Sequence, residues 1–131
     1  MKISAAWAFC SLIILVPGIA WASGMVSVGT INGQTTSYDS SSLAWSGNTV
    51  TAMVEATFAT PQPLSSAANG PVAARAIEHM AFACGTGNYT DLGVTAFSPA
   101  GTVVYTRTTA DGPKPAAAGT PAASLYAALC Q

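Results

Sequence analysis

This chain of 131 residues has few charged side chains, because Asp, Glu, Lys and Arg together make up 7% of it. About a quarter is usual in a soluble domain. After residue 22 the basic side chains are Arg75, Arg107 and Lys114. Nucleic-acid binding needs a basic face that neutralises phosphates, so three scattered basic residues exclude that class of protein. The surface is expected to consist of small polar and small apolar side chains.

Histidine is almost absent, because His79 is the single one in the chain. A hydrolase triad would have to join it to a serine and to an acid such as Asp39 or Asp91. The sequence has no Gly-x-Ser-x-Gly turn to expose a nucleophile, so we interpret His79 as a surface or sheet-packing residue. It also has no partners at metal-ligand spacing. We therefore expect no metal and no other cofactor.

Acidic residues are sparse as well and stand singly in the sequence. They are Asp39, Glu55, Glu78, Asp91 and Asp111. Glu55 and Glu78 would be able to act as an acid and a base if their strands were neighbours. Isolated carboxylates more often lie on solvated faces, so we favour that interpretation and predict that the protein is not an enzyme.

Long apolar runs are missing after the first residues of the chain. The one such run extends from Ile3 to Val16 behind the basic Lys2, and a breaking Pro17-Gly18 pair and small residues follow it. This pattern predicts a signal peptide over residues 1–22, which is cleaved between Ala22 and Ser23. Cleavage at Gly24 is the alternative. A membrane anchor is the competing interpretation, but a span needs about 20 apolar residues.

Export without a lipid anchor follows from the place of the first cysteine. Cys10 lies inside the apolar run rather than directly after the cleavage point, where lipid attachment would require it. We expect a protein of the periplasm or the cell surface that is not lipid-anchored. No transmembrane segment is expected in the mature chain.

Removal of the signal leaves one domain of 109 residues, 23–131, with two cysteines. In an oxidising compartment Cys84 and Cys130 are expected to form one disulfide. That bond closes a loop of about 47 residues, for which loop entropy suggests roughly 4 kcal/mol of stabilisation as an upper figure. The C-terminus is therefore expected to be anchored on the body of the domain.

Strand patterns dominate the first half of this domain. Residues 25–30 and 35–39 are expected to form a hairpin through the tight turn at 31–34, in which Asn32-Gly33 tolerates positive φ. A second turn is expected at residues 46–48. Residues 49–59 then alternate with a period of two. The predicted core face of this strand consists of Val50, Ala52, Val54, Ala56 and Phe58.

The middle of the chain is less regular. The two prolines in residues 60–63 are expected to stop the strand, and residues 64–71 to form an exposed loop. Residues 72–84 have the composition of a helix, but the period does not decide between helix and strand. We favour a strand for residues 77–84.

Toward the C-terminus the pattern predicts one more hairpin and a helix. Residues 88–97 and 101–109 are expected to pair through a turn at 98–101. Residues 110–115 are expected to be a loop, because two prolines and a glycine exclude both ladder and helix. Thr120-Pro121 then has the form of an N-cap followed by proline at the first helical position. The helix over residues 122–129 has an apolar face of Leu125, Tyr126 and Leu129.

Candidate contact residues fall into two groups. Aromatic side chains are one source of a binding platform, although core or edge packing is the more common role in a small sheet. They are Trp45, Tyr89, Tyr105 and Tyr126. The loops at residues 60–71 and 111–115 are better candidates for a partner surface, because loops on a rigid sheet often carry specificity.

Several short segments together resemble a known family. They are Tyr38–Ser42, Ser46–Thr51, Thr60–Gln62, Phe82–Cys84, Ala100–Val104 and Ser124–Cys130. In order and spacing they resemble the surface-adhesin protein E family of Gram-negative bacteria, over residues 25–131. The resemblance implies an α+β domain in which an antiparallel sheet of about five or six strands packs against a short C-terminal helix. It also implies the disulfide between Cys84 and Cys130.

For function, the resemblance implies binding of host extracellular-matrix or plasma proteins at the cell surface. An alternative is a periplasmic structural or envelope-stress component with no adhesive role, which the missing lipid attachment and the weak charge suggest. Both a monomer and a dimer are compatible with the sequence. A fold of this kind does not by itself decide between these roles.

Overall fold

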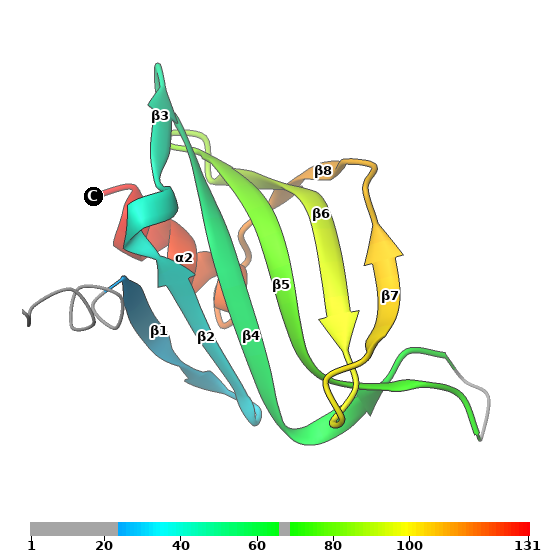
Figure 1. The fold of residues 1–131 in the computed structure, drawn as a ribbon. Helices are drawn as coiled ribbons and strands as arrows, with labels where there is room; N and C mark the ends of the chain where they lie inside the picture. The colour runs from blue at the N-terminus through cyan, green and yellow to red at the C-terminus, as the bar shows by residue number, and fades with distance from the viewer. Residues whose placement is uncertain (1–23, 66–68) are drawn as a thin grey trace, which may run out of the picture.

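The computed structural model describes residues 24–65 and 69–131, which form one curved antiparallel sheet with a single helix against it (Figure 1). The predicted signal and its cleavage site at Ala22 and Ser23 lie outside these residues. The elements are β1 (Met25–Ile31), β2 (Gln34–Asp39), η4 (Ser40–Ser42), β3 (Ala44–Ser46), β4 (Thr49–Pro63), β5 (Val72–Ala83), β6 (Asn88–Phe97), β7 (Val103–Arg107), β8 (Asp111–Pro115) and α2 (Pro121–Leu129). The predicted fold class is confirmed. No helix in the described ranges is long and apolar enough to cross a membrane.

Six strands form the continuous path of the sheet, in the order β1-β2-β4-β5-β6-β7. Two short strands bring the sheet to eight, because β3 pairs with the start of β4 and β8 pairs with the start of β6. The sheet thus matches the predicted size along its path, and the two short edge strands are additional.

Turn chemistry and alternation explain the first half of the sheet. Asn32 and Gly33 have φ angles of 51° and 81°, which is the left-handed conformation that a two-residue hairpin needs. On β4 the predicted core face is confirmed, since Val50, Ala52 and Val54 are buried. Their neighbours in sequence point to the opposite face.

The core lies between the sheet and α2. Phe82 of β5, Leu125 of α2 and Val50 of β4 are its largest fully buried side chains. The helix begins as predicted, because the Thr120 hydroxyl accepts a hydrogen bond from the amide of Ala123 (3.3 Å). A second, smaller cluster of alanines lies at the other end of the sheet and consists of Ala73, Ala76 and Ala96.

Two predicted boundaries around residues 60–84 need correction. The strand does not stop at residues 60–63, because β4 continues through Pro63 and pairs with β5 again at Gln62 and Pro63 after a register shift. The pairing of β2 with β4 extends only as far as Phe58. Pro61 and Pro63 lie beyond that point, where one edge of β4 has no neighbouring strand and needs no amide donor. Residues 72–83 are strand throughout, which removes the helical alternative. Residues 64–65 and 69–71 form the expected loop.

The prediction of a loop at residues 110–115 was wrong, because Asp111–Pro115 forms β8. This strand pairs with β6 on one side only, and an edge strand tolerates prolines whose missing amides would face solvent. Gly112 makes the pairing possible, since a Cβ there would lie 3.0 Å from the carbonyl oxygen of Tyr89.

Candidate binding surface

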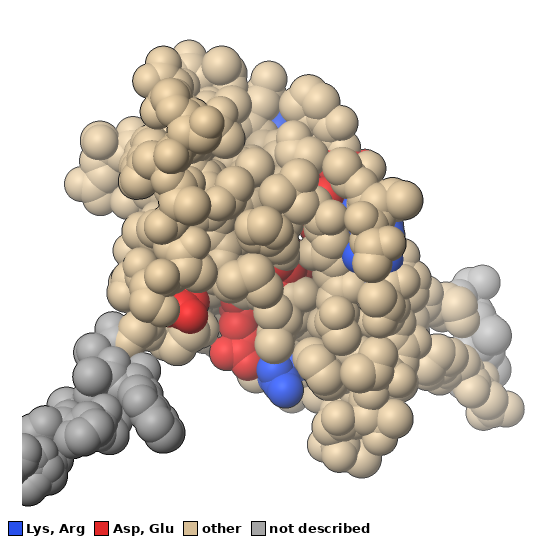
Figure 2. Space-filling model, turned by 45° about the horizontal axis from the view of Figure 1, so that its top comes forward, with Lys and Arg blue, Asp and Glu red and all other residues tan. Residues whose placement is uncertain are grey.

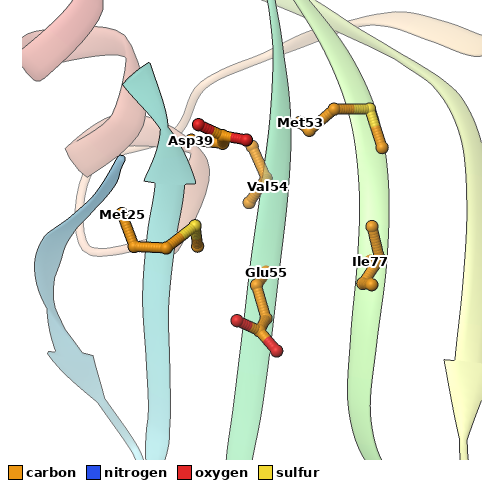
Figure 3. Close-up of a pocket in the computed structure, with 6 residues that line it drawn as sticks. All are labelled: Met25, Asp39, Met53, Val54, Glu55 and Ile77. Atoms are coloured by element: carbon orange, nitrogen blue, oxygen red, sulfur yellow. The ribbon is translucent and has the colours of Figure 1, made fainter. Parts of the chain in front are cut away.

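The sheet has one face covered by α2, which we call the covered face. No helix within residues 24–65 and 69–131 packs against the opposite face, which we call the open face. Alternation along β4 and β5 places Met53 and Ile77 on the open face, opposite the buried Val54 and Met80. Together with Met25 of β1 they line an apolar hollow of about 160 Å³. Figure 3 shows Met25, Met53 and Ile77 above neighbouring strands of the sheet, with carboxylates between and beside them.

Two carboxylates border this hollow. The Oδ1 atom of Asp39 accepts hydrogen bonds from the hydroxyl (2.6 Å) and the amide (2.9 Å) of Ser41, and these bonds lower the pKa of Asp39. Glu55 forms an ion pair with Arg75 (3.2 Å), whose guanidinium lies 4.2 Å from the centre of the Phe97 ring. The hollow therefore combines an apolar floor with an ionised carboxylate at one side and an ion pair at the other.

A second hollow of about 290 Å³ adjoins the first one on the open face. The two share Met53 and Ile77, and the second is also lined by His79 of β5 and Thr106 of β7. The open face thus carries a continuous uneven surface from β1 to β7, with Met53 and Ile77 at its centre.

The structure does not bring together the residues that a hydrolase triad would have needed. His79 is exposed on the open face opposite Met53, and Asp39 borders the first hollow. Asp91 is buried and lines a cavity on the covered face. In the part of the chain that the structure describes, no group of three or more His, Cys, Asp or Glu side chains is placed to hold a metal ion.

The strands of Glu55 and Glu78 are neighbours, but the two carboxylates do not meet. Glu55 pairs with Ile77 and Val54 pairs with Glu78, so the two acids point to opposite faces. Glu78 instead shares a cavity with Asp91, which sequence reasoning missed because it needs the register of β5 on β6.

Three of the acids, isolated in the sequence, form ion pairs in the fold that the sequence did not predict. The ion pairs are Glu55–Arg75 (3.2 Å), Asp91–Arg107 (3.0 Å) and Asp111–Lys114 (2.9 Å). Figure 2 shows the charged side chains in small groups on a surface that is otherwise uncharged.

The aromatic side chains do not form one platform. Trp45 on β3 is 57% exposed and Tyr105 on β7 is also exposed, whereas Tyr89 and Tyr126 pack against the core. Tyr105 lies on β7, the last strand of the path, whereas Trp45 lies on β3, which pairs with β4 off the path. Packing is thus the role of two of these aromatics, and the other two are separate exposed groups.

Tyr126 has a specific structural role that the sequence did not indicate. Its hydroxyl accepts hydrogen bonds from the amides of Gly85 (2.7 Å) and Gly87 (2.9 Å). The neighbouring disulfide joins Cys84 to Cys130 with an S–S distance of 2.04 Å, as predicted. The turn after β5 and the end of α2 are therefore joined by a covalent bond and by hydrogen bonds.

The architecture and the disulfide are those that the resemblance implied. The family model for surface-adhesin protein E matches residues 25–131. The chain belongs to this family. The match begins at β1 and includes every described strand and the helix. No curated protein and no solved structure matches the chain.

Proposed function

We propose that this chain is an exported binding domain that attaches to a protein partner, such as a host extracellular-matrix or plasma protein, and that it catalyses no reaction. The observation that carries the proposal is membership of the surface-adhesin protein E family over residues 25–131. Binding by a member of such a family needs an accessible surface rather than a catalytic constellation.

The open face is the contact surface that we propose. Exposed apolar patches with polar borders commonly mark protein interaction sites. Met25, Met53 and Ile77 form such a patch, bordered by Asp39 and Glu55. Hollows near the centre of an interface accept the anchoring side chains that contribute most of the binding energy. A partner that inserts an aliphatic or aromatic side chain beside a basic one would fit this arrangement.

The absence of catalysis is supported by the separation of the reactive side chains. His79, Asp39 and Asp91 lie in three different surroundings, two on the open face and one on the covered face. A general base must lie within hydrogen-bond reach of the group it deprotonates. A broad screen of esterase and glycosidase substrates is expected to give no turnover that is lost in His79→Ala.

Binding of the purified domain to immobilised matrix and plasma proteins tests the proposed surface. Met53 and Val26 are each 37% exposed, but Met53 lies in the open-face hollow whereas Val26 neighbours the core-facing Tyr38 across β1 and β2. Met53→Ser is expected to weaken binding at least several-fold, because it removes a central apolar contact. Val26→Ser is the matched control and is expected to bind like the unmodified domain.

Equal weakening by Met53→Ser and Val26→Ser would contradict the open face as the site. Failure of the unmodified domain to bind any partner in the panel would count against adhesion itself. Protease treatment of intact cells tests display, since a surface protein is expected to be digested. Release with the periplasm alone, without digestion, would favour a structural envelope component instead.

A further inference from the structure

A cavity of about 280 Å³ lies on the covered face, between the sheet and the first turn of α2. Side chains from β2, β5, β6, β8 and the helix N-cap line it, and most of them are polar. They are Gln34, Thr36, Glu78, Asp91, Lys114 and Thr120. A cavity of this size approaches the lower end of small-molecule sites.

The charges around the cavity do not balance. Asp91 is paired with Arg107 (3.0 Å) and Lys114 is paired with Asp111 (2.9 Å). Glu78 is the fifth ionisable group; it is in none of the ion pairs of the described residues, and its carboxyl shares a side-chain hydrogen bond with Asp91. Its neighbours across the strands are Val54 and Val94, and α2 has no charged residue. When Glu78 is ionised, this cluster carries one uncompensated negative charge.

The surroundings of Glu78 reflect this imbalance. Burial, and then the negative charge of Asp91, raise the pKa of Glu78 to about 7, against the opposing effects of Arg107 and Lys114. Tyr89 also lines the cavity but is uncharged at neutral pH. Near neutral pH the Glu78 carboxyl is therefore protonated in a large fraction of molecules. The proton neutralises the charge for which the cluster has no matching cation.

We propose that this cavity binds a small organic cation, such as a primary ammonium group, whose charge replaces the proton of Glu78. The ammonium donates hydrogen bonds to the carboxylates of Glu78 and Asp91. Its hydrocarbon part lies against Met80 and Leu125, which also line the cavity. Lys114 and the positive end of the helix dipole oppose a cation, so we expect weak binding, located at the Glu78–Asp91 side.

The exchange is balanced in charge and protons. The ammonium enters with its charge, the Glu78 carboxyl loses one proton to the buffer, and no covalent bond is made. A metal ion is a poorer occupant, because the described part of the chain provides no three-ligand group. The inference is independent of adhesion, since the cavity and the proposed partner surface lie on opposite faces of the sheet.

NMR titration of the full mature domain with n-propylammonium chloride at pH 6 and pH 8 tests the proposal. Amide signals of Thr36, Glu78 and Asp91 are expected to shift. The dissociation constant is expected to fall about tenfold from pH 6 to pH 8, because the ionised fraction of a carboxyl with pKa near 7 rises by that factor. Sodium chloride at equal ionic strength is expected to leave these signals unchanged.

Glu78→Gln is expected to abolish the shifts, because the amide cannot supply the charge. Glu55→Gln on the open face is the matched control and is expected to bind like the unmodified domain. The inference is overturned if Glu78→Gln binds equally well, if affinity does not rise with pH, or if sodium or calcium chloride produces the same shifts. The pH series of the unmodified domain decides the question without any variant.

Discussion

The two faces of the sheet are built from the same strands but differ in what their side chains do. On the covered face Val50, Phe82 and Leu125 have almost no exposed surface. On the open face the side chains of Met25 and Met53 are exposed and line a hollow (Figure 3). The buried core is therefore concentrated on one face of the sheet.

This difference also explains the place of the cross-links. The disulfide and the Tyr126 hydroxyl join the end of α2 to the turn after β5. They keep the helix on the covered face, and no helix of the described residues packs on the open face. A sheet that is fixed from one side provides a rigid support for binding on the other.

The largest contrast is expected from truncating one buried and one exposed side chain. Phe82→Ala is expected to lower the free energy of unfolding by about 3 to 5 kcal/mol, because it leaves a cavity in the core. Met53→Ala on the same pair of strands is expected to change it by about 0.5 kcal/mol or less. Urea unfolding at pH 7 measures both, and similar losses would contradict the division between the faces.

Removal of the disulfide is expected to have the next largest effect. The double variant Cys84→Ser with Cys130→Ser is expected to lose about 2 to 4 kcal/mol, because the unfolded chain gains freedom. Relative to the unmodified protein, hydrogen exchange in this variant is expected to accelerate more at the amides of α2 than at those of β4 and β5. Unchanged exchange in α2 would show that packing alone holds the helix.

Glu78 is expected to make the covered face sensitive to pH. Its pKa of about 7 lies above the unfolded value of 4.5, so the folded state binds more protons between these values. The contribution of Glu78 to the free energy of unfolding is fully present below pH 4.5 and is lost as the pH rises through 7. Glu78→Gln is expected to remove the decline and to be more stable than the unmodified protein at pH 8, by on the order of 1 to 2 kcal/mol.

Thermal unfolding at pH 4.5, 6 and 8 measures this effect. Glu55→Gln is the control, since Glu55 lies on the open face beside Arg75. A pH profile of Glu78→Gln that declines as steeply as that of the unmodified protein would contradict the assignment of the titration to Glu78.

The smallest effect is expected at Tyr126. Tyr126→Phe is expected to cost about 1 kcal/mol, because the amides of Gly85 and Gly87 lose their acceptor while the ring stays in place. Tyr105→Phe on the exposed β7 is the control and is expected to be neutral. Chemical denaturation of both variants decides the comparison.

The sequence predicted those parts of the fold that depend on neighbouring residues. The alternation of β4, the Asn32-Gly33 turn and the Thr120-Pro121 helix start are local patterns, and all three are present. The sequence did not predict β8, because proline statistics describe isolated segments and not the one-sided pairing of an edge strand.

The binding surface was less predictable for the same reason. Met25, Met53 and Ile77 come from three strands that are separated in sequence, and the meeting of Glu78 and Asp91 depends on register across β5 and β6. The irregular pairing between His79 and Met80 contributes to this arrangement. Without knowledge of the strand order, the sequence does not distinguish these residues from other strand residues.

Three methionines in residues 24–131 allow the most direct test of the central claim, that a partner binds the open face. Met25 and Met53 line the open-face hollow, and Met80 is buried on the covered face. In a titration of methyl-labelled protein with a matrix or plasma protein that it binds, the methyl signals of Met25 and Met53 are expected to shift or broaden well before that of Met80. A response of Met80 with unchanged Met25 and Met53 signals would contradict the account.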